Sequence, residues 1–376
     1  MRIYLVGGAV RDMFLGRPVQ DRDYVVVGGS EAELMRRIPG LTRVGRREPV
    51  WVRQGEEYTL APEADIHANL ASRDLTINAL ALDEDGQVIA LPGAMEDLSA
   101  RVLRPVAAAN IMADPARLVR AARFAAQFPD FRVDVSWEEI ARAMPETALG
   151  AVAAERVGAE VRKVCAAPAP GRFLRLAAAW GGLQPWCAIW HAAASIPAGP
   201  KPYHQESLLE HTAQVMDACA GDPLAVWMAL THDMGKTATP EEFWPRHHGH
   251  ERRGETLARE WGRRLRLPSA WIQAGALAAR WHMAAARYAE LKAATRVRLV
   301  TELARSGLLF PFARLVQADH GLDVREWMEE DLRRIQAVRL PLHLQGIGKK
   351  SGEALHALRC AALAPVSQES RSSDRR

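Results

Sequence analysis

Residues 3–12 read IYLVGGAVRD, and residues 21–27 read DRDYVVV. The first segment predicts an apolar strand that ends at two glycines and is followed by a helix from Ala9. Adjacent glycines let backbone N–H groups approach a phosphate closely, and the positive end of the helix favours the same negative charge. Alternate residues of a strand share one face, so we expect the carboxylates of Asp21 and Asp23 to point the same way.

These two segments together predict a nucleoside triphosphate site that holds Mg²⁺. The carboxylates of Asp21 and Asp23 repel each other unless a cation lies between them, and oxygen ligands beside phosphates favour Mg²⁺. Gly8 and Arg11 then become candidate phosphate contacts. A tight turn or a solvated Asp-x-Asp loop explains either segment alone, but the two in this order indicate nucleotidyl transfer.

A second group of motifs follows: residues 72–80 read SRDLTINAL and residues 114–125 read DPARLVRAARFA. The later segment carries an arginine at every third position of an expected helix, which gives a cationic stripe suited to polyphosphate and to a base edge. An aspartate accepts from the exocyclic amine of C or A and an arginine donates to ring acceptors, so Asp114 with Arg117 can imitate a template. An arginine-rich surface helix is the alternative.

The order of these motifs resembles the head of the polymerase-β-like nucleotidyltransferases, in particular the class II tRNA nucleotidyltransferases and the bacterial poly(A) polymerases. The resemblance implies that Asp21 and Asp23 are the catalytic Mg²⁺ ligands. The nucleotide-binding residues that it implies, for ATP and CTP, are Gly8, Arg11, Arg73, Asp114, Arg117, Arg120 and Arg123.

A third constellation follows a Pro- and Gly-containing break at residues 196–202. It comprises His211, the adjacent pair His232 and Asp233, and the distant Asp319. Two imidazoles and two carboxylates suit a divalent transition metal or Mg²⁺, and ligands on separate helices are expected to converge in a bundle core. A buried structural His–Asp pair is the alternative.

Two more histidines lie in neighbouring helical runs. His250 and His282 are candidates for a second metal, for a phosphate, or for a supporting role around the first ligands. The third constellation, with the segment DMGKT at residues 233–237, resembles the HD phosphohydrolase superfamily. That resemblance leaves the metal open, and imidazole-rich ligation makes Ni²⁺, Co²⁺ and Mn²⁺ candidates.

Fusion of such a head to an HD domain resembles one branch, the multifunctional bacterial CCA-adding enzymes. This implies template-independent addition of C, C and A to the tRNA 3′ end from CTP and ATP, in tRNA maturation and repair. It also implies a metal-dependent phosphohydrolase that acts on 2′,3′-cyclic, 2′- and 3′-phosphates. The implied partners are the tRNA 3′ end and the two nucleotides.

Three departures from the family pattern keep alternatives open. Ser72 replaces the first arginine of the R-R-D motif, Ala113 replaces a glutamate, and the connection at residues 60–71 is shortened. In related enzymes this connection helps the site switch from C to A. The alternatives are therefore an enzyme that adds only CC, an HD phosphohydrolase with a degenerate head, and a poly(A) polymerase.

Composition agrees with a folded protein that acts on RNA in the cytoplasm. The 376 residues are 48% hydrophobic, and no apolar run is long enough to span a bilayer, so no membrane partner is expected. The four cysteines show no C-x-x-C spacing, which suggests free thiols in a reducing compartment. The net charge is only +4, so RNA contact would depend on local basic patches. The expected oligomeric state is a monomer or a homodimer.

The expected fold class is α+β: a polymerase-β-like head with a mixed sheet and helices, then an all-α neck and an all-α HD domain. Turn residues punctuate the first hundred positions, whereas the pattern from about residue 105 is helical almost throughout. The expected divisions are a head at 1–104, a helical neck and body at 105–200, an HD domain at 205–325, C-terminal helices at 326–364 and a disordered tail at 365–376.

Overall fold

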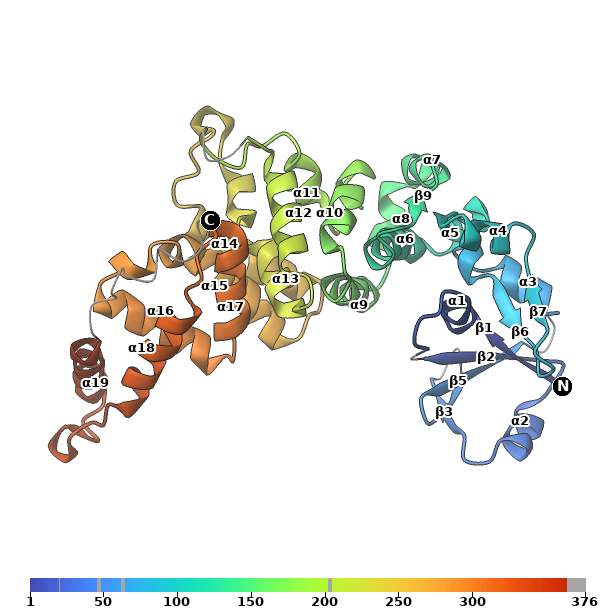
Figure 1. Ribbon diagram of the computed structural model, residues 1–376, viewed down its shortest axis with the longest axis horizontal. Coiled ribbons are helices and arrows are strands. Elements are labelled where there is room, and N and C mark those ends of the chain that lie inside the picture. The colour runs from blue at the N-terminus through green and yellow to red at the C-terminus, as the bar shows by residue number, and fades with distance from the viewer. Residues whose placement is uncertain (20, 46–48, 62–64, 202–204, 364–376) are drawn as a thin grey trace. The chain divides into compact units, whose positions relative to one another are not determined.

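The computed structural model describes residues 1–19, 21–45, 49–61, 65–201 and 205–363 (Figure 1). The chain divides into two compact units, of which the first comprises Met1–Val152 with Leu183–Pro185, and the second Ala153–Gly182 with Trp186–Arg376. The finer divisions at residues 104, 200 and 325 remain predictions. The expected tail at 365–376 lies outside the described residues.

The first unit contains a seven-stranded mixed sheet, in the order β3-β4-β5-β2-β1-β6-β7. The neighbouring strands β2 and β5 are parallel, and the other neighbours are antiparallel. The strands are β1 (Arg2–Val6), β2 (Arg22–Val27), β3 (Thr42–Val44), β4 (Val50–Arg53), β5 (Glu56–Ala61), β6 (Leu80–Leu82) and β7 (Val88–Ala90).

Both faces of this sheet are covered, which explains why β1 and β2 read as continuous apolar runs. Helix α3 (Ile66–Ala71) packs Ile66 and Leu70 against Tyr4 and Val25 on one face. Helix α2 (Glu31–Arg37) packs Leu34 on the other face, against a second apolar cluster that includes Val26. A capping box formed by Ser30 and Glu33 fixes the start of α2.

The remainder of the first unit is mainly helical. Its elements are α1 (Gly8–Phe14), η1 (Thr76–Asn78), α4 (Ala94–Ser99), β8 (Val102–Leu103), α5 (Ala108–Ala113), α6 (Ala116–Gln127), β9 (Arg132–Val133), α7 (Ser136–Ala143) and α8 (Glu146–Gly150). The short strand β9 interrupts the expected helical region because it pairs in parallel with β8. Arg104 joins this region by bonding Asp97 at 3.0 Å and Asp134 at 2.8 Å.

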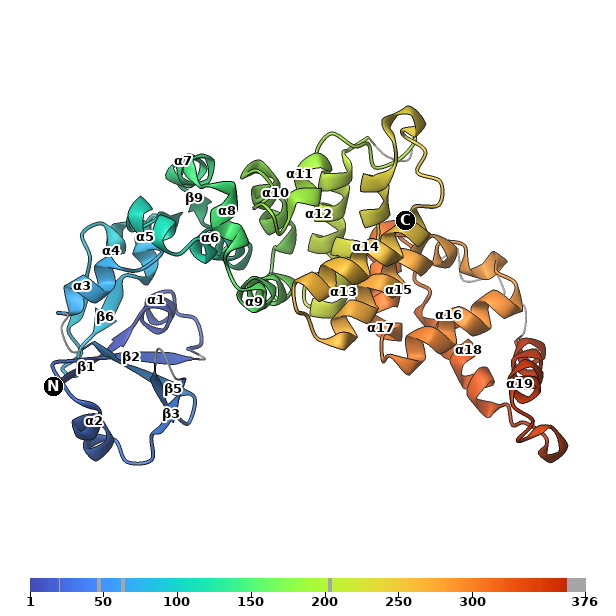
Figure 2. The same cartoon turned by 180° about the vertical axis from the view of Figure 1, so that it is seen from behind.

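The second unit is helical throughout its described part (Figure 2). Its α-helices are α9 (Ala154–Cys165), α10 (Pro170–Ala179), α11 (Ala188–Ala192), α12 (Leu208–Ala218), α13 (Pro223–Thr231), α14 (His250–Arg264), α15 (Ser269–Ala285), α16 (Ala293–Arg305), α17 (Leu309–His320), α18 (Arg325–Ala337) and α19 (Lys349–Ala362). The 3₁₀ turns are η2 (Met234–Ala238), η3 (Glu241–Phe243), η4 (Tyr288–Glu290) and η5 (Leu342–Leu344).

Helix α13 forms the centre of this bundle and is buried from Ala225 to Thr231. It packs against α12, α15 and α17, so its C-terminal end is surrounded by helices on several sides. The end of α13 is therefore the place where side chains from distant segments can meet.

No helix among the described residues is both long and apolar enough to cross a membrane.

Candidate functional site

The carboxylate pair that the sequence predicts lies at the start of strand β2. Asp23 is the second residue of β2, whereas Asp21 lies one position before the strand begins, rather than within it. Burial raises the pKa of Asp23, and the negative charge of Asp21 raises it as well. The positive charges of Arg73 and Arg120 act in the opposite direction. These four side chains are therefore close enough to interact electrostatically, as a metal and phosphate site needs.

A third carboxylate, which the sequence reasoning missed, belongs to the same region. Glu57 on β5 is the parallel-register partner of Asp23 on β2. Side chains of partners in a parallel pair point to the same face, so Glu57 lies on the face that Asp23 uses. Only the register of the sheet reveals this pairing, because the two residues are 34 positions apart.

The turn between β1 and α1 brings the backbone close to Arg73. Gly7 has a φ of +70°, and a Cβ atom there would lie 2.4 Å from Nη1 of Arg73. Arg73 donates to Oδ1 of Asn69 at 3.1 Å and to the carbonyl of Asn78 at 3.4 Å. Its Nε atom is buried and finds no hydrogen-bond partner among the described residues, so one donor remains available for an anion.

Gly8 and Arg11, the other two predicted phosphate contacts, both lie in α1, and the role of Gly8 stays a prediction. Gly8 is the first residue of α1, and a Cβ atom there would lie 3.4 Å from Nη2 of Arg11. The guanidinium of Arg11 is buried, bonds Oδ1 and Oδ2 of Asp12 at 2.9 Å, and lies 4.7 Å from the ring centre of Phe128. Arg11 thus ties α1 to α6, and its nucleotide role stays a prediction.

The three arginines of α6 do not form one continuous stripe. Nε and Nη2 of Arg120 both lie 3.0 Å from Oδ2 of Asp74. Nε of Arg117 lies 3.6 Å from Oδ2 of Asp114, which keeps the predicted base-reading pair together. Arg123 is buried, with its guanidinium 3.5 Å from the ring centre of Phe124. A spacing of three residues falls short of a full helical turn, so successive arginines drift around the helix and Arg123 lies in the core.

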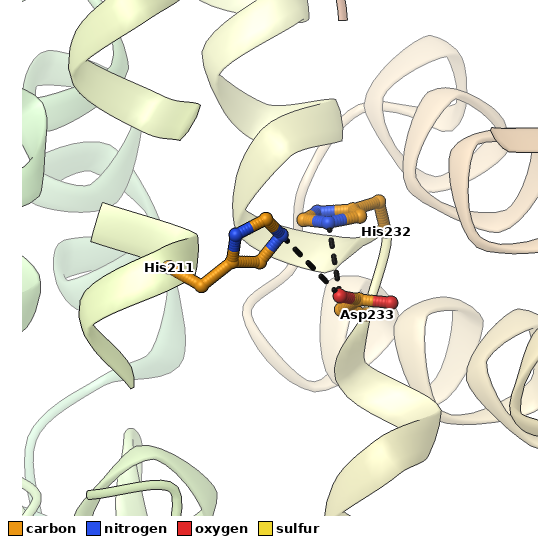
Figure 3. Close-up of side chains that lie close together, drawn as sticks. All are labelled: His211, His232 and Asp233. Atoms are coloured by element: carbon orange, nitrogen blue, oxygen red, sulfur yellow. Dashed lines mark ion pairs between the residues drawn. The ribbon is translucent and has the colours of Figure 1, made fainter. Parts of the chain in front are cut away.

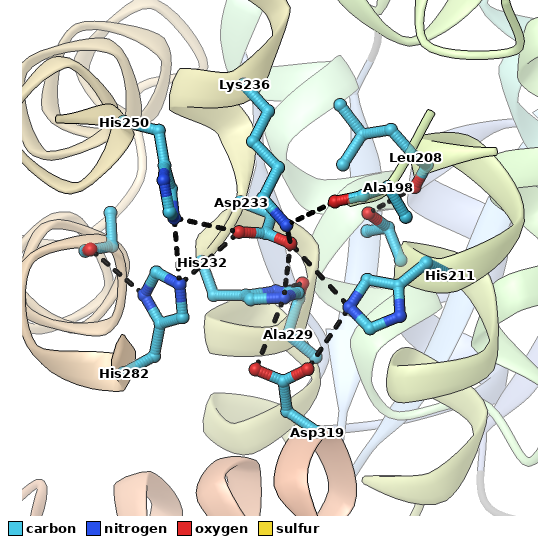
Figure 4. A network of polar contacts seen from close by, with 12 residues as sticks. Ala198, Leu208, His211, Ala229, His232, Asp233, Lys236, His250, His282 and Asp319 are labelled. Atoms are coloured by element: carbon cyan, nitrogen blue, oxygen red, sulfur yellow. Dashed lines mark hydrogen bonds and ion pairs between the residues drawn. The ribbon is translucent and has the colours of Figure 1, made fainter. Parts of the chain in front are cut away.

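The second unit brings together the four predicted HD residues at the end of α13; Figure 3 shows His211, His232 and Asp233, and Figure 4 adds Asp319. His211 comes from α12, His232 and Asp233 follow α13, and Asp319 comes from α17. Nε2 of His211 lies 3.1 Å from Oδ1 of Asp319, and Nε2 of His232 lies 3.2 Å from Oδ2 of Asp233. His211, His232 and Asp233 form one buried group with metal-ligand spacing.

His250 and His282 complete a second such group on the other side of the same aspartate (Figure 4). Oδ1 of Asp233 lies 3.2 Å from Nε2 of His250 and 3.3 Å from Nε2 of His282. Gly235 permits this approach, since a Cβ atom there would lie 2.0 Å from the carbonyl oxygen of His250. The two carboxylate oxygens of Asp233 therefore face two different pairs of imidazoles.

Backbone carbonyls orient three of these rings. Nδ1 of His232 lies 2.7 Å from the carbonyl oxygen of Ala229. Nδ1 of His250 lies 2.8 Å from the carbonyl oxygen of His247, and Nδ1 of His282 lies 3.0 Å from that of Ala279. Each carbonyl accepts a hydrogen bond from an Nδ1 proton, so in the neutral ring Nε2 is the atom with the free lone pair that a metal needs. All three Nε2 atoms point towards Asp233.

Two buried atoms of the cluster have no hydrogen-bond partner in the described part of the chain: Nε2 of His232 and Oδ1 of Asp233. Burial lowers the pKa of His232, but the carboxylates of Asp233 and Asp319 outweigh burial and raise it to about 9. Burial raises the pKa of Asp233, yet Lys236 and His232 outweigh burial and keep it well below the usual range. Oriented imidazole and carboxylate atoms that make no hydrogen bond to a described residue fit a divalent metal.

Two further residues near the cluster were not assigned roles from the sequence. Nζ of Lys236 bonds Oδ2 of Asp233 at 2.5 Å and the carbonyl of Ala198 at 2.7 Å. Nε2 of His320 lies 3.1 Å from Oδ2 of Asp319. The position of Lys236 in the DMGKT segment, one helical turn after Asp233, was the available signal.

Comparisons with known proteins found a family model and relatives that span nearly the whole chain. The HD domain family model matches residues 208–305. The multifunctional CCA protein of Methylococcus capsulatus is 36% identical over 96% of this chain and 94% of its own length, and that of Halorhodospira halophila is 36% identical over 97% of both.

Solved structures share the fold. The Bacillus stearothermophilus CCA-adding enzyme in complex with CTP has a TM-score of 0.68 at 23% identity, covering 96% of this chain and 87% of its own. The Thermotoga maritima CCA-adding enzyme complexed with tRNA has a TM-score of 0.64 at 22% identity, covering 98% and 88%.

A polymerase-β-like head with a mixed sheet, joined to a helical body and an HD domain, defines a class: nucleotidyltransferases fused to an HD domain. Full-length identity of about a third with named relatives then settles the family. The chain belongs to the multifunctional CCA protein family.

Proposed function

We propose that the first unit adds C, C and A to the 3′ end of tRNA from CTP and ATP without a nucleic-acid template. Asp21 and Asp23 would hold Mg²⁺, which when bound lowers the pKa of the attacking hydroxyl and neutralises developing charge. The tRNA 3′-oxygen loses its proton and forms a bond to the α-phosphorus, while the bond from that phosphorus to the leaving oxygen breaks and pyrophosphate departs. Glu57 lies on the same face and is a third candidate ligand.

Arginines near the carboxylates would hold the nucleotide. Arg73 offers a buried Nε without a partner in the described residues, and Gly7 lets this guanidinium approach the turn before α1. Arg120 adds positive charge near Asp23. The pair of Asp114 and Arg117 would read the base edge, since a carboxylate beside a guanidinium matches the donors and acceptors of C and A.

We propose that the HD cluster of the second unit is a metal-dependent phosphohydrolase for 2′,3′-cyclic, 2′- and 3′-phosphates. His211, His232, Asp233 and Asp319 would hold a divalent metal, with Ni²⁺, Co²⁺ or Mn²⁺ as candidates. When bound, the metal would supply a water of lowered pKa and withdraw charge from the phosphate. His250 and His282, with Oδ1 of Asp233, have the spacing for a second ion.

The observation that carries this two-site proposal is the presence of an Asp-x-Asp pair beside arginines in one unit and of the His–Asp cluster in the other. Substitution at one site should therefore spare the other. We expect Asp21→Ala to abolish nucleotide addition and to retain phosphatase activity, and His232→Ala to do the reverse. Loss of both activities in either variant would contradict two independent sites.

A second candidate function for the first unit is addition of CC alone. One observation favours it: strand β5 ends at Ala61 and α3 begins at Ile66, so the connection before the Ser72–Arg73 motif is short. Residues 62–64 of this connection lie outside the described residues. A product analysis that counts added nucleotides separates CC from CCA addition. Incorporation of ATP alone would instead favour a poly(A) polymerase.

Both activities concern RNA ends, and we propose that the chain acts in the cytoplasm on tRNA during its maturation and repair. The four cysteines agree with a reducing compartment, since all of them are free thiols.

A further inference from the structure

The His–Asp cluster forms part of a pocket of about 500 Å³. His211, Asp233, His250, His282 and Asp319 all line this pocket, and each of them is buried or nearly so. Other lining residues are exposed, among them Arg246, His248 and Arg287. The pocket therefore has a buried metal-type cluster inside and two arginines where it meets solvent.

The segment that carries Arg246 is held in place by several hydrogen bonds. The Arg246 N–H donates to the carbonyl of Phe243 at 2.8 Å, and the Trp244 indole donates to the carbonyl of Thr239 at 3.0 Å. Arg253 of α14 donates to the carbonyl of His248 and to Oγ1 of Thr239, both at 3.0 Å. Arg246 thus extends from a fixed backbone, which reduces the entropy lost when it binds a ligand.

Arg287 approaches the pocket from a different element. It lies two residues after the end of α15, and its N–H donates to the carbonyl of Ala284 at 3.1 Å. Within the described ranges, neither the Arg246 nor the Arg287 guanidinium makes a hydrogen bond or an ion pair. Surface arginines without partners are common, but here two of them, from separate elements, line the pocket that holds the cluster.

The charge around the pocket exceeds what one phosphate needs. Lys236 is already bound to Asp233, and a metal at the cluster would contact the reacting phosphate. Apart from Asp233 and Asp319, Glu251 is the acidic residue among those that line the pocket, and its carboxylate lies 4.0 Å from Nδ1 of His250. Two guanidinium groups therefore remain for additional anionic groups of the ligand.

We propose that Arg246 and Arg287 bind phosphodiester groups that precede the terminal phosphate of an RNA 3′ end. The HD pocket then takes the end of a polynucleotide in preference to a free mononucleotide, which has no phosphodiester to offer these arginines. This inference rests on the phosphohydrolase activity proposed above, and it adds two residues that select an RNA end over a mononucleotide.

The test compares two substrates with the same reacting group. The full-length protein, supplied with Ni²⁺, is assayed with adenosine 2′,3′-cyclic phosphate and with a short single-stranded oligoribonucleotide that ends in a 2′,3′-cyclic phosphate. The variants are Arg246→Gln, Arg287→Gln and the double substitution. The control is Arg263→Gln. Helix α14 begins at His250, which lines the pocket, whereas Arg263 is exposed near the C-terminal end of α14 and does not line the pocket.

For the double variant, we expect the KM for the oligonucleotide to rise about ten-fold more than the KM for the mononucleotide, because each lost guanidinium removes a charge-assisted contact. The kcat for the oligonucleotide should change much less than its KM, and Arg263→Gln should change neither. An equal rise of KM for both substrates, or no rise for either, would overturn the proposal.

A binding measurement keeps the test valid if the wild-type protein hydrolyses neither substrate. Fluorescence anisotropy then measures the affinity of a 3′-phosphorylated oligoribonucleotide for the wild type and the double variant over a range of salt concentrations. If the double variant binds more weakly, and its affinity depends less steeply on salt concentration, the result supports the RNA site. In that case the RNA site stands even though the phosphohydrolase proposal fails. Equal affinities would refute the RNA site itself.

Discussion

Oδ2 of Asp74 lies 3.0 Å from both Nε and Nη2 of Arg120, and the carboxylate of Asp74 is buried. Asp74 also directly follows Arg73, the arginine whose buried Nε lacks a partner among the described residues. One short segment therefore positions Arg73 through the backbone and Arg120 through a charge pair. Both arginines affect the electrostatics of Asp23, so this segment couples α6 to the carboxylates of β2.

Asp74→Asn should destabilise the fold by about 1–2 kcal/mol, because it weakens an ion pair of which only the carboxylate is buried. It should also raise the KM for CTP, since Arg120 loses the partner that positions it. Urea unfolding and steady-state kinetics measure the two effects. The control is Asp130→Asn, which removes a surface pair with Arg101 and should change stability by less than about 0.5 kcal/mol.

The same pair predicts a pH dependence. Burial raises the pKa of Asp74, but Arg120 and hydrogen bonds from Asn78 and the Leu75 N–H outweigh burial and lower it. A carboxylate whose pKa is lower in the folded state stabilises the fold above its unfolded pKa of about 3.9, and this stabilisation is lost as the pH falls through the folded value.

The difference in unfolding free energy between wild type and Asp74→Asn should therefore stay constant from pH 8 to pH 5 and shrink below about pH 4. Urea unfolding at each pH measures it. A difference that grew on acidification would mean that the ionised carboxylate does not stabilise the fold.

Two glycines should be indispensable, each for one site. Gly7→Ala places a Cβ atom 2.4 Å from Nη1 of Arg73 at a φ of +70°, so nucleotide addition should fall while phosphohydrolase activity persists. Gly235→Ala meets the backbone of His250 and should impair the HD site alone.

The matched control for both glycines is Gly352→Ala in α19, where nothing lies within 4 Å of the added atom. There the substitution should leave both activities unchanged and stabilise the fold by about 0.5–1 kcal/mol. Thermal unfolding and both activity assays on the three variants check these expectations. Full nucleotide addition by Gly7→Ala would show that Arg73 need not approach this turn.

Metal binding at the HD cluster should stabilise the second unit. A ligand that binds only the folded state raises the unfolding free energy by RT ln(1 + [L]/Kd), which is about 2.7 kcal/mol at a hundred-fold excess over Kd. Addition of Ni²⁺ to the chelator-treated protein should therefore raise the midpoint of thermal unfolding. His211→Ala should remove most of this rise, whereas a full rise in that variant would place the metal elsewhere.

The sequence predicts the elements of both sites better than their contacts. The apolar strand before Gly7 and the helix after it follow from local patterns, as does the serine-capped helix α2. The contact of Arg11 with Phe128 does not follow from a local pattern, because the two residues lie far apart in the sequence. The fold of the first unit brings the guanidinium of Arg11 to the ring of Phe128. Glu57 escaped notice for the same reason, because its position depends on strand register.

In the HD cluster, the residue types of His211, His232, Asp233 and Asp319 are enough to indicate a shared site, because all four offer metal-ligand atoms. The placement of His250 against Asp233 depends instead on the close packing of α14 on η2, which the small size of Gly235 and Gly254 permits. Sequence spacing carries no information on such an approach.

We propose that the first unit completes CCA ends through Asp21 and Asp23. The most direct test incubates the purified protein with tRNA that lacks its 3′ terminus, Mg²⁺ and labelled CTP, with and without ATP, and resolves the products at single-nucleotide resolution. We expect growth by two nucleotides with CTP alone and by three when ATP is present, with Asp21→Ala inactive and His232→Ala unaffected. Growth that stops at two nucleotides in the presence of ATP, or no growth at all, would contradict CCA addition by the first unit.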